Sequence, residues 1–199
     1  MPSVSNNYHE TFESRVINKL RGMGFAVSSA TYHDVLEQSV SDALAKNYSP
    51  TALYIRTRAD RIAVRNDISF ELECKTHENE RYSDMTLEVL PVLHHINKVG
   101  LGVDCLYAYW NPFTDMYRGF WVSDMPQVRD IRIPSNTRYN TDAVAVVMQA
   151  ESRFPEATVY TNPGRGDGSH DPYIIIDKSE VKRMNKLKII FDSMEATDE

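Results

Sequence analysis

Three polar residues, Asp60, Glu73 and Lys75, are spaced so that a β-hairpin would bring them together. From Ile68 to Lys75, apolar and polar residues alternate, which is the pattern of a strand with one face in a core. Glu73 and Lys75 therefore share a face, about 6 to 7 Å apart. Two carboxylates beside an ammonium group form a site that suits a hard divalent cation.

The geometry of the site depends on the turn between the two strands expected at 61–64 and 68–75. With a two-residue turn at Asn66-Asp67, Asp60 lies directly across from Glu73, with Cβ atoms about 5 Å apart. This register places both carboxylates at one point.

A three-residue turn gives a different register, in which Ile62 faces Phe70 and Val64 faces Ile68. That register suits the apolar core better, but Asp60 then needs a bend or a bulge to reach Glu73. The sequence leaves both registers open.

Asp60 followed by Glu73-Cys74-Lys75 resembles the signature of the PD-(D/E)xK nuclease superfamily, which is an Asp at a strand start, a hairpin and then Glu-x-Lys. Ala59 stands where that family most often has Pro. The resemblance implies that Asp60, Glu73 and the Cys74 carbonyl bind one or two Mg²⁺ or Mn²⁺ ions. It also implies that Lys75 positions the attacking water, and that the products carry 5′-phosphate and 3′-hydroxyl ends.

The N-terminal segment supplies a further acid. Apolar residues at helical spacing, among them Phe12, Val16 and Leu20, predict a helix over 9–24, with Glu13 at the edge of its packing face. Residues 13–27 resemble the first helix and strand of archaeal and phage Holliday-junction resolvases. This resemblance makes Glu13 an additional acid at the metal site, with Glu10 as the fallback.

The function expected from these resemblances is a Mg²⁺-dependent endodeoxyribonuclease, with specificity for branched DNA such as a Holliday junction as one form of it. Junction resolvases place two sites symmetrically, so that form predicts a homodimer. Two alternatives stay open: a catalytically silent module on a nuclease fold that binds nucleic acid or protein, and an RNA nuclease.

Composition limits the partners and the cellular location. The 199 residues contain 42% hydrophobic residues, enough for one core, and we expect a single domain over 1–199. No apolar run suggests a membrane span or a signal peptide, so we expect a cytoplasmic protein, with a phage origin left open, and two reduced, buried thiols at Cys74 and Cys105.

The net charge of −6 argues against binding nucleic acid through overall charge. Four arginines nevertheless lie close to the expected acidic site in the sequence, and we expect them to contact phosphates of DNA. They are Arg56, Arg58, Arg61 and Arg65.

The order of the other expected elements indicates an α/β fold, with a mixed central sheet flanked by helices as in a restriction-endonuclease-like core. We expect helices over 34–46, from Pro91 to Val99, over 140–154 and after Ser179. Strands are expected over 105–110, 118–122 and 173–176, with an extended segment over 51–57. The roles of Glu88, the histidines at 77, 94 and 95, and the Gly-rich loop near Arg165 are left open.

Overall fold

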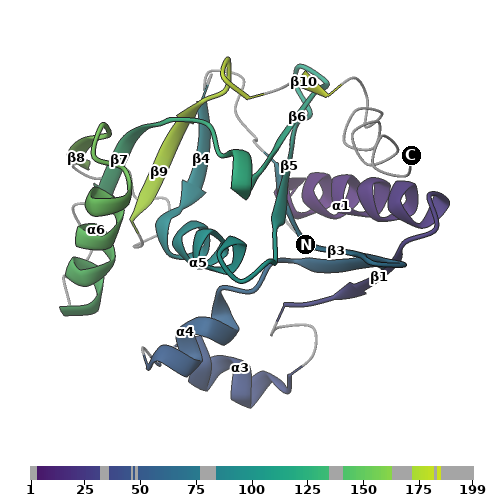
Figure 1. Ribbon diagram of the computed structural model, residues 1–199, viewed down its shortest axis with the longest axis horizontal. Coiled ribbons are helices and arrows are strands. Elements are labelled where there is room, and N and C mark those ends of the chain that lie inside the picture. The colour runs from purple at the N-terminus through teal and green to yellow at the C-terminus, as the bar shows by residue number, and fades with distance from the viewer. Residues whose placement is uncertain are drawn as a thin grey trace.

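The computed structural model describes residues 4–31, 36–45, 47, 49–76, 84–134, 141–162, 172–181 and 183–184 (Figure 1). The helices are α1 (Val4–Gly22), α3 (Gln38–Ala45), α4 (Pro50–Arg56), α5 (Val89–Val99) and α6 (Thr141–Arg153), with a short 3-10 helix at Val122–Asp124. The strands are β1 (Ala26–Ser29), β2 (Arg61–Arg65), β3 (Ile68–Thr76), β4 (Asp84–Glu88), β5 (Cys105–Asn111), β6 (Met116–Trp121), β7 (Val128–Pro134), β8 (Thr158–Asn162), β9 (Tyr173–Asp177) and β10 (Arg183–Met184).

The larger sheet has six strands in the order β1-β2-β3-β5-β6-β10. The pair β3 and β5 is parallel, and the other neighbouring strands are antiparallel, so the sheet is mixed. Strand β3, which carries Glu73 and Lys75, lies in the interior of this sheet.

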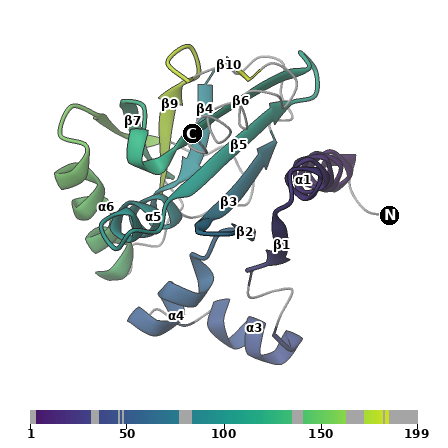
Figure 2. The ribbon, with the colours of Figure 1, turned by 45° about the vertical axis from the view of Figure 1, so that its right-hand side comes forward.

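Helices cover both faces of this sheet (Figures 1 and 2). On one face, α1 places Phe12, Val16 and Leu20 in a buried cluster with Phe70 and Leu72 of β3. On the other face, a separate buried cluster joins apolar residues of α5 to Tyr107 and Tyr109 of β5. The predicted fold class, a mixed central sheet flanked by helices, is confirmed.

A second sheet, of four strands in the order β4-β9-β7-β8, was not predicted. It lies with α6 on the α5 side of the molecule (Figure 1). Its inner residues Met85, Ile131, Ile174 and Ile176 belong to the same buried cluster as α5. The second sheet therefore completes the core that supports the α5 face of the central sheet.

The hairpin has the two-residue turn. Arg65 pairs with Ile68 and Ala63 with Phe70, which leaves Asn66 and Asp67 as the turn residues. Asn66 has a φ of 52°, in the left-handed region that asparagine tolerates better than most residues. The pairing of Ile62 with Phe70, the alternative from sequence, does not occur.

Asn66→Ala is expected to lower the free energy of unfolding by about 1 kcal/mol, because alanine adopts the left-handed region at higher cost. Asn66→Gly, the matched control, should cost less than Asn66→Ala, since glycine carries no steric penalty there. Urea unfolding of the three proteins checks this order, and equal losses in both variants would contradict it.

Two expected elements differ in the structure. Residues 50–56 form helix α4 and not an extended segment: Pro50 occupies the first helical position, and the Ser49 hydroxyl accepts a hydrogen bond from the Ala52 N–H at 3.3 Å. Ser179 does not start a helix, because its N–H and hydroxyl both donate to Asp177 Oδ1 in a turn.

The chain after that turn forms β10, which pairs with β6. The remainder of the helix expected there, His77 and the Gly-rich loop near Arg165 lie outside the described residues.

Candidate functional site

Two hydrogen bonds from backbone N–H groups across the start of the hairpin hold the carboxylates of Asp60 and Glu73 in place. The Asp60 N–H donates to Glu73 Oε2 at 3.2 Å, and the Cys74 N–H donates to Asp60 Oδ2 at 2.8 Å. Asp60 lies in the short connection between α4 and β2, and this connection fixes the position of its backbone. The two carboxylates predicted to form a site are therefore brought together.

Lys75 lies on the same face of β3 as Glu73, and its Nζ is 2.6 Å from Glu73 Oε1. The Glu73 side chain is 7% exposed and that of Lys75 is 34% exposed. Tyr107 and Tyr109 of β5 pair with Glu73 and Lys75 in the parallel register and form the neighbouring part of this face. The Lys75 side chain is thus more open to solvent than that of Glu73.

The carboxylates of the site outnumber its ammonium groups. Burial, together with the charge of Glu73, raises the pKa of Asp60 to about 7, and Glu13 adds a smaller effect in the same direction. Burial acts to lower the pKa of Lys75, but the charges of Glu73 and Asp60 outweigh it and raise that pKa. Lys75 is accordingly held as a cation, and Asp60 ionises near neutral pH.

These residues fit a hard divalent cation. Mg²⁺ is usually bound by one or two carboxylates and keeps several water ligands. Among the described residues, no three His, Cys, Asp or Glu side chains converge as a metal site. The ligands would be Asp60 and Glu73, completed by the Cys74 carbonyl and water, and a bound cation would offset the charge that raises the pKa of Asp60.

The Cys74 thiol has a different role from its carbonyl. It is fully buried in the cluster under α1, and burial raises its pKa well above the usual value. Cys105 is also a buried, unpaired thiol, so the prediction of two buried thiols is confirmed.

Glu13 lies on the α1 side of the hairpin and forms an ion pair with Arg61, whose Nε donates to Glu13 Oε1 at 2.7 Å. Both side chains are largely buried. Glu10, the fallback, is exposed on α1. Glu13 is thus near enough to affect Asp60, but Arg61 already neutralises its charge.

Glu13→Gln is therefore expected to lower Mn²⁺ affinity only about threefold, because the Arg61 charge that Glu13 then no longer balances is partly exposed and is screened by solvent. Calorimetric titration of the variant and the unmodified chain checks this value. A loss as large as that of Asp60→Asn would instead make Glu13 a direct ligand.

The structure places two of the four arginines on one side of the sheet, one on the other side and one at the end of α4. Arg61 and Arg65 lie on the α1 side, where Arg65 donates to the Met23 carbonyl at 3.1 Å and stacks 4.7 Å from the Phe25 ring centre. Arg58 lies on the other side, where its charge helps lower the pKa of His94. Arg56 ends α4 and donates to the Asn47 carbonyl at 3.4 Å.

Sequence reasoning missed a group of buried polar residues next to Glu73. Glu71 forms an ion pair with Lys98 of α5, and His95 contacts Tyr107. The alternation in β3 placed Glu71 on a polar face, and His95 and Lys98 are one turn apart, but nothing in the sequence shows that α5 covers that face. Glu88, left open from sequence, lies at the end of β4, and its charge helps raise the pKa of Lys75.

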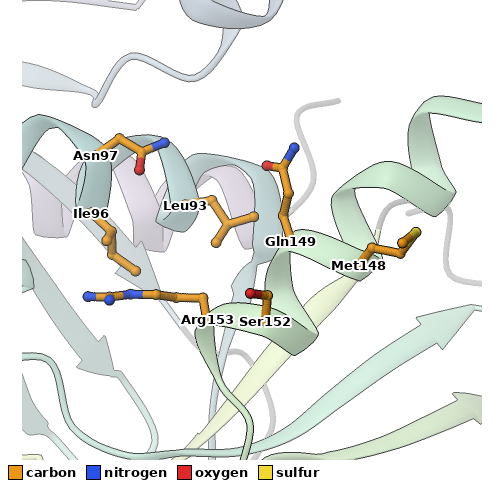
Figure 3. A pocket seen from close by; sticks show the side chains of 7 residues that line it. All are labelled: Leu93, Ile96, Asn97, Met148, Gln149, Ser152 and Arg153. Atoms are coloured by element: carbon orange, nitrogen blue, oxygen red, sulfur yellow. The ribbon is translucent and has the colours of Figure 1, made fainter.

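A pocket of about 720 Å³ lies between α5 and α6 (Figure 3). Leu93 and Ile96 of α5 face Ser152 and Arg153 of α6 across it. The described residues that line it include none of the expected site residues, so it is separate from the Asp60 and Glu73 pair.

No helix among the described residues has the length and apolar composition that a membrane crossing requires.

No protein-family model and no curated protein match the sequence. Among solved structures, similar chains include nucleases. One is Hjc from Archaeoglobus fulgidus, a Holliday junction resolvase, at 19% identity over 57% of this chain and 75% of that chain, with a TM-score of 0.38. Another is D212, a nuclease from a fusselovirus, at 13% identity over 100% of this chain and 98% of that chain, with a TM-score of 0.44.

Proposed function

We propose that this protein is a metal-dependent DNA endonuclease that hydrolyses phosphodiester bonds. The observation that carries the proposal is the arrangement of Asp60, Glu73 and Lys75, in which two carboxylates, each held by a backbone N–H, lie beside an ammonium group. An acidic pair with an adjacent lysine is suited to holding a cation and a phosphate at the same point.

The residues have distinct roles in this proposal. Asp60 and Glu73 hold Mg²⁺ or Mn²⁺, which when bound supplies an acidified water and neutralises charge on the scissile phosphate. Lys75, which is partly exposed, orients the attacking water and offsets phosphate charge. The backbone N–H of Cys74 keeps the Asp60 carboxylate oriented. Glu13 and Arg61 border the site.

The test is cleavage of labelled DNA duplex, single strand, flap and four-way junction, and of an RNA, in Mg²⁺ and in Mn²⁺. Each substrate is also given to Asp60→Asn, which keeps the side-chain size and removes the charge. Metal-dependent cutting of DNA that Asp60→Asn lacks supports the proposal. Full activity in Asp60→Asn would refute it, and cutting of RNA alone would make the protein an RNA nuclease.

The junction-specific form of the proposal requires two sites related by symmetry, so it predicts a homodimer. Sedimentation at micromolar concentration should then show twice the mass of one chain, and the four-way junction should be cut in preference to the duplex. A monomer would leave a general endonuclease and exclude the symmetric junction form.

A second candidate function is a module that binds nucleic acid or protein without catalysis. The close pairing of Lys75 with Glu73 and of Arg61 with Glu13 favours it, since both pairs neutralise charge without a metal. Calorimetry separates the two candidates: the nuclease takes up Mn²⁺ and loses it in Asp60→Asn, whereas the module shows no such uptake.

A further inference from the structure

Four buried polar side chains form a chain of contacts behind Glu73 that the proposed reaction does not use. Lys98 Nζ lies 2.5 Å from Glu71 Oε1, and the Tyr107 hydroxyl lies 2.9 Å from His95 Nδ1. His95 Nε2 lies 3.8 Å from Glu71 Oε2, which links the two pairs. Each of the four residues is at most 8% exposed.

This group is in direct contact with the strand that carries the site. Glu71 is two residues before Glu73 on the same face of β3, which places the two Cα atoms about 6 to 7 Å apart. Tyr107 lies beside Glu73 in the parallel register. Lys98 comes from the last turn of α5, so the ion pair joins that helix to β3.

Stability alone explains this ion pair poorly. Removing two charges from water costs several kcal/mol per ion, and replacing a buried pair by apolar residues is often neutral or stabilising. The Glu71 Oε2 atom also has no hydrogen-bond donor among the described residues, and a buried acceptor without one is costly. The charge of Lys98 therefore requires an explanation other than helix packing.

The other charges on this face of the sheet explain why a buried lysine is present at position 98. Asp60, Glu71, Glu73 and Glu88 contribute four carboxylates, while Lys75, Lys98 and Arg58 contribute three cationic groups. Glu13 and Arg61 neutralise each other. When all these groups are charged, one negative charge remains, which one divalent cation more than offsets.

We propose that Lys98 is a positioning residue that serves as a resident cation. By holding Glu71, its ammonium group leaves Asp60 and Glu73 as the carboxylates that bind metal, and the site takes one divalent ion per chain. This inference rests on the proposed function, because it concerns the metal count at that same site.

The experiment is calorimetric titration of the full chain with Mn²⁺. The unmodified chain should bind one Mn²⁺, and Asp60→Asn should lose it. Lys98→Met frees the Glu71 carboxylate and should raise the count to about two. Lys98→Arg, which keeps the charge, and the double variant Glu71→Gln/Lys98→Met, which removes both charges, should each bind one.

A second comparison applies if Lys98→Met does not fold, as judged by circular dichroism. Glu71→Gln leaves the Lys98 charge without its partner and should weaken Mn²⁺ binding about tenfold. The double variant Glu71→Gln/Lys98→Met should restore the affinity to within about twofold. The free energy of unfolding of each variant is measured alongside, and a loss and recovery of affinity that only follows the loss and recovery of stability would overturn the role of Lys98.

The outcomes distinguish a failure of the proposed role of Lys98 from a failure of the proposed nuclease function. The role of Lys98 would be overturned if the unmodified chain bound two Mn²⁺ ions. It would also be overturned if all folded variants at positions 71 and 98 bound the same number of Mn²⁺ ions with the same affinity. Neither result would contradict the proposed nuclease function. Absence of Mn²⁺ uptake by the unmodified chain would overturn the metal-dependent nuclease and this inference together.

Discussion

Replacing Lys75 by methionine is expected to slow DNA cleavage by about 10²- to 10³-fold while Mn²⁺ binding is kept. Removing one fixed electrostatic group aimed at charge that develops in a transition state typically has an effect of this size. Lys75 Nζ lies 2.6 Å from Glu73 Oε1 and is partly exposed, so its loss removes the side-chain charge that the proposed mechanism places beside the phosphate. Single-turnover cleavage and Mn²⁺ calorimetry on the same preparation check both parts.

The matched control is Lys19→Met, which removes an exposed lysine of α1. It should leave the cleavage rate within about twofold, since an exposed charge away from the site is largely screened. Cleavage by Lys75→Met at the unmodified rate would remove Lys75 from the mechanism.

Asp60→Asn is expected to stabilise the metal-free protein by about 2 kcal/mol at pH 8 and by almost nothing at pH 4. The pKa of Asp60 is raised from 3.8 to about 7 in the folded protein, chiefly by burial and by Glu73. Between these values the unfolded chain has released the proton that the folded chain still holds, so folding stability falls as pH rises through this window. The full shift corresponds to about 4 kcal/mol, reduced here because the site is partly open to solvent.

Urea unfolding at pH 4, 6 and 8, with chelator present, measures this difference between the variant and the unmodified chain. Glu151→Gln, at an exposed carboxylate of α6, is the control and should show no such trend. Saturating Mg²⁺ should shrink the gain, because the cation stabilises the ionised form of Asp60. A difference that does not vary with pH would show that the raised pKa of Asp60 is wrong.

The site was predictable from sequence to the extent that it depends on local geometry. Glu73 and Lys75 are two residues apart on one strand, and a turn of two residues is enough to place Asp60 opposite Glu73. The register was left open because apolar pairing favoured the wrong turn. In the structure, Asn66 adopts the left-handed conformation that a short turn needs.

Features that depend on long-range packing were not predictable in the same way. The partner of Glu71 is Lys98. That contact exists because α5 packs on the face of the central sheet that α1 does not cover. The sequence of strand β7 does not alternate cleanly, because Arg129 and Asp130 are adjacent at an irregularity in its pairing with β9, so no strand is predicted there. Residues 50–56 are rich in residues that favour strands, but the Ser49 cap and Pro50 determine a helix.

The position of β4 in the chain has a consequence for folding. It lies between β3 and α5, inside the crossover that joins the parallel strands β3 and β5, yet it pairs with β9, so that Asp84 meets Asp177. A polypeptide leaving the ribosome must therefore hold Met85 and Leu87 without their partners Ile176 and Ile174 until about ninety more residues have emerged. Formation of the second sheet, and of the core that it shares with α5, is then a late event that is completed when the C-terminal half docks.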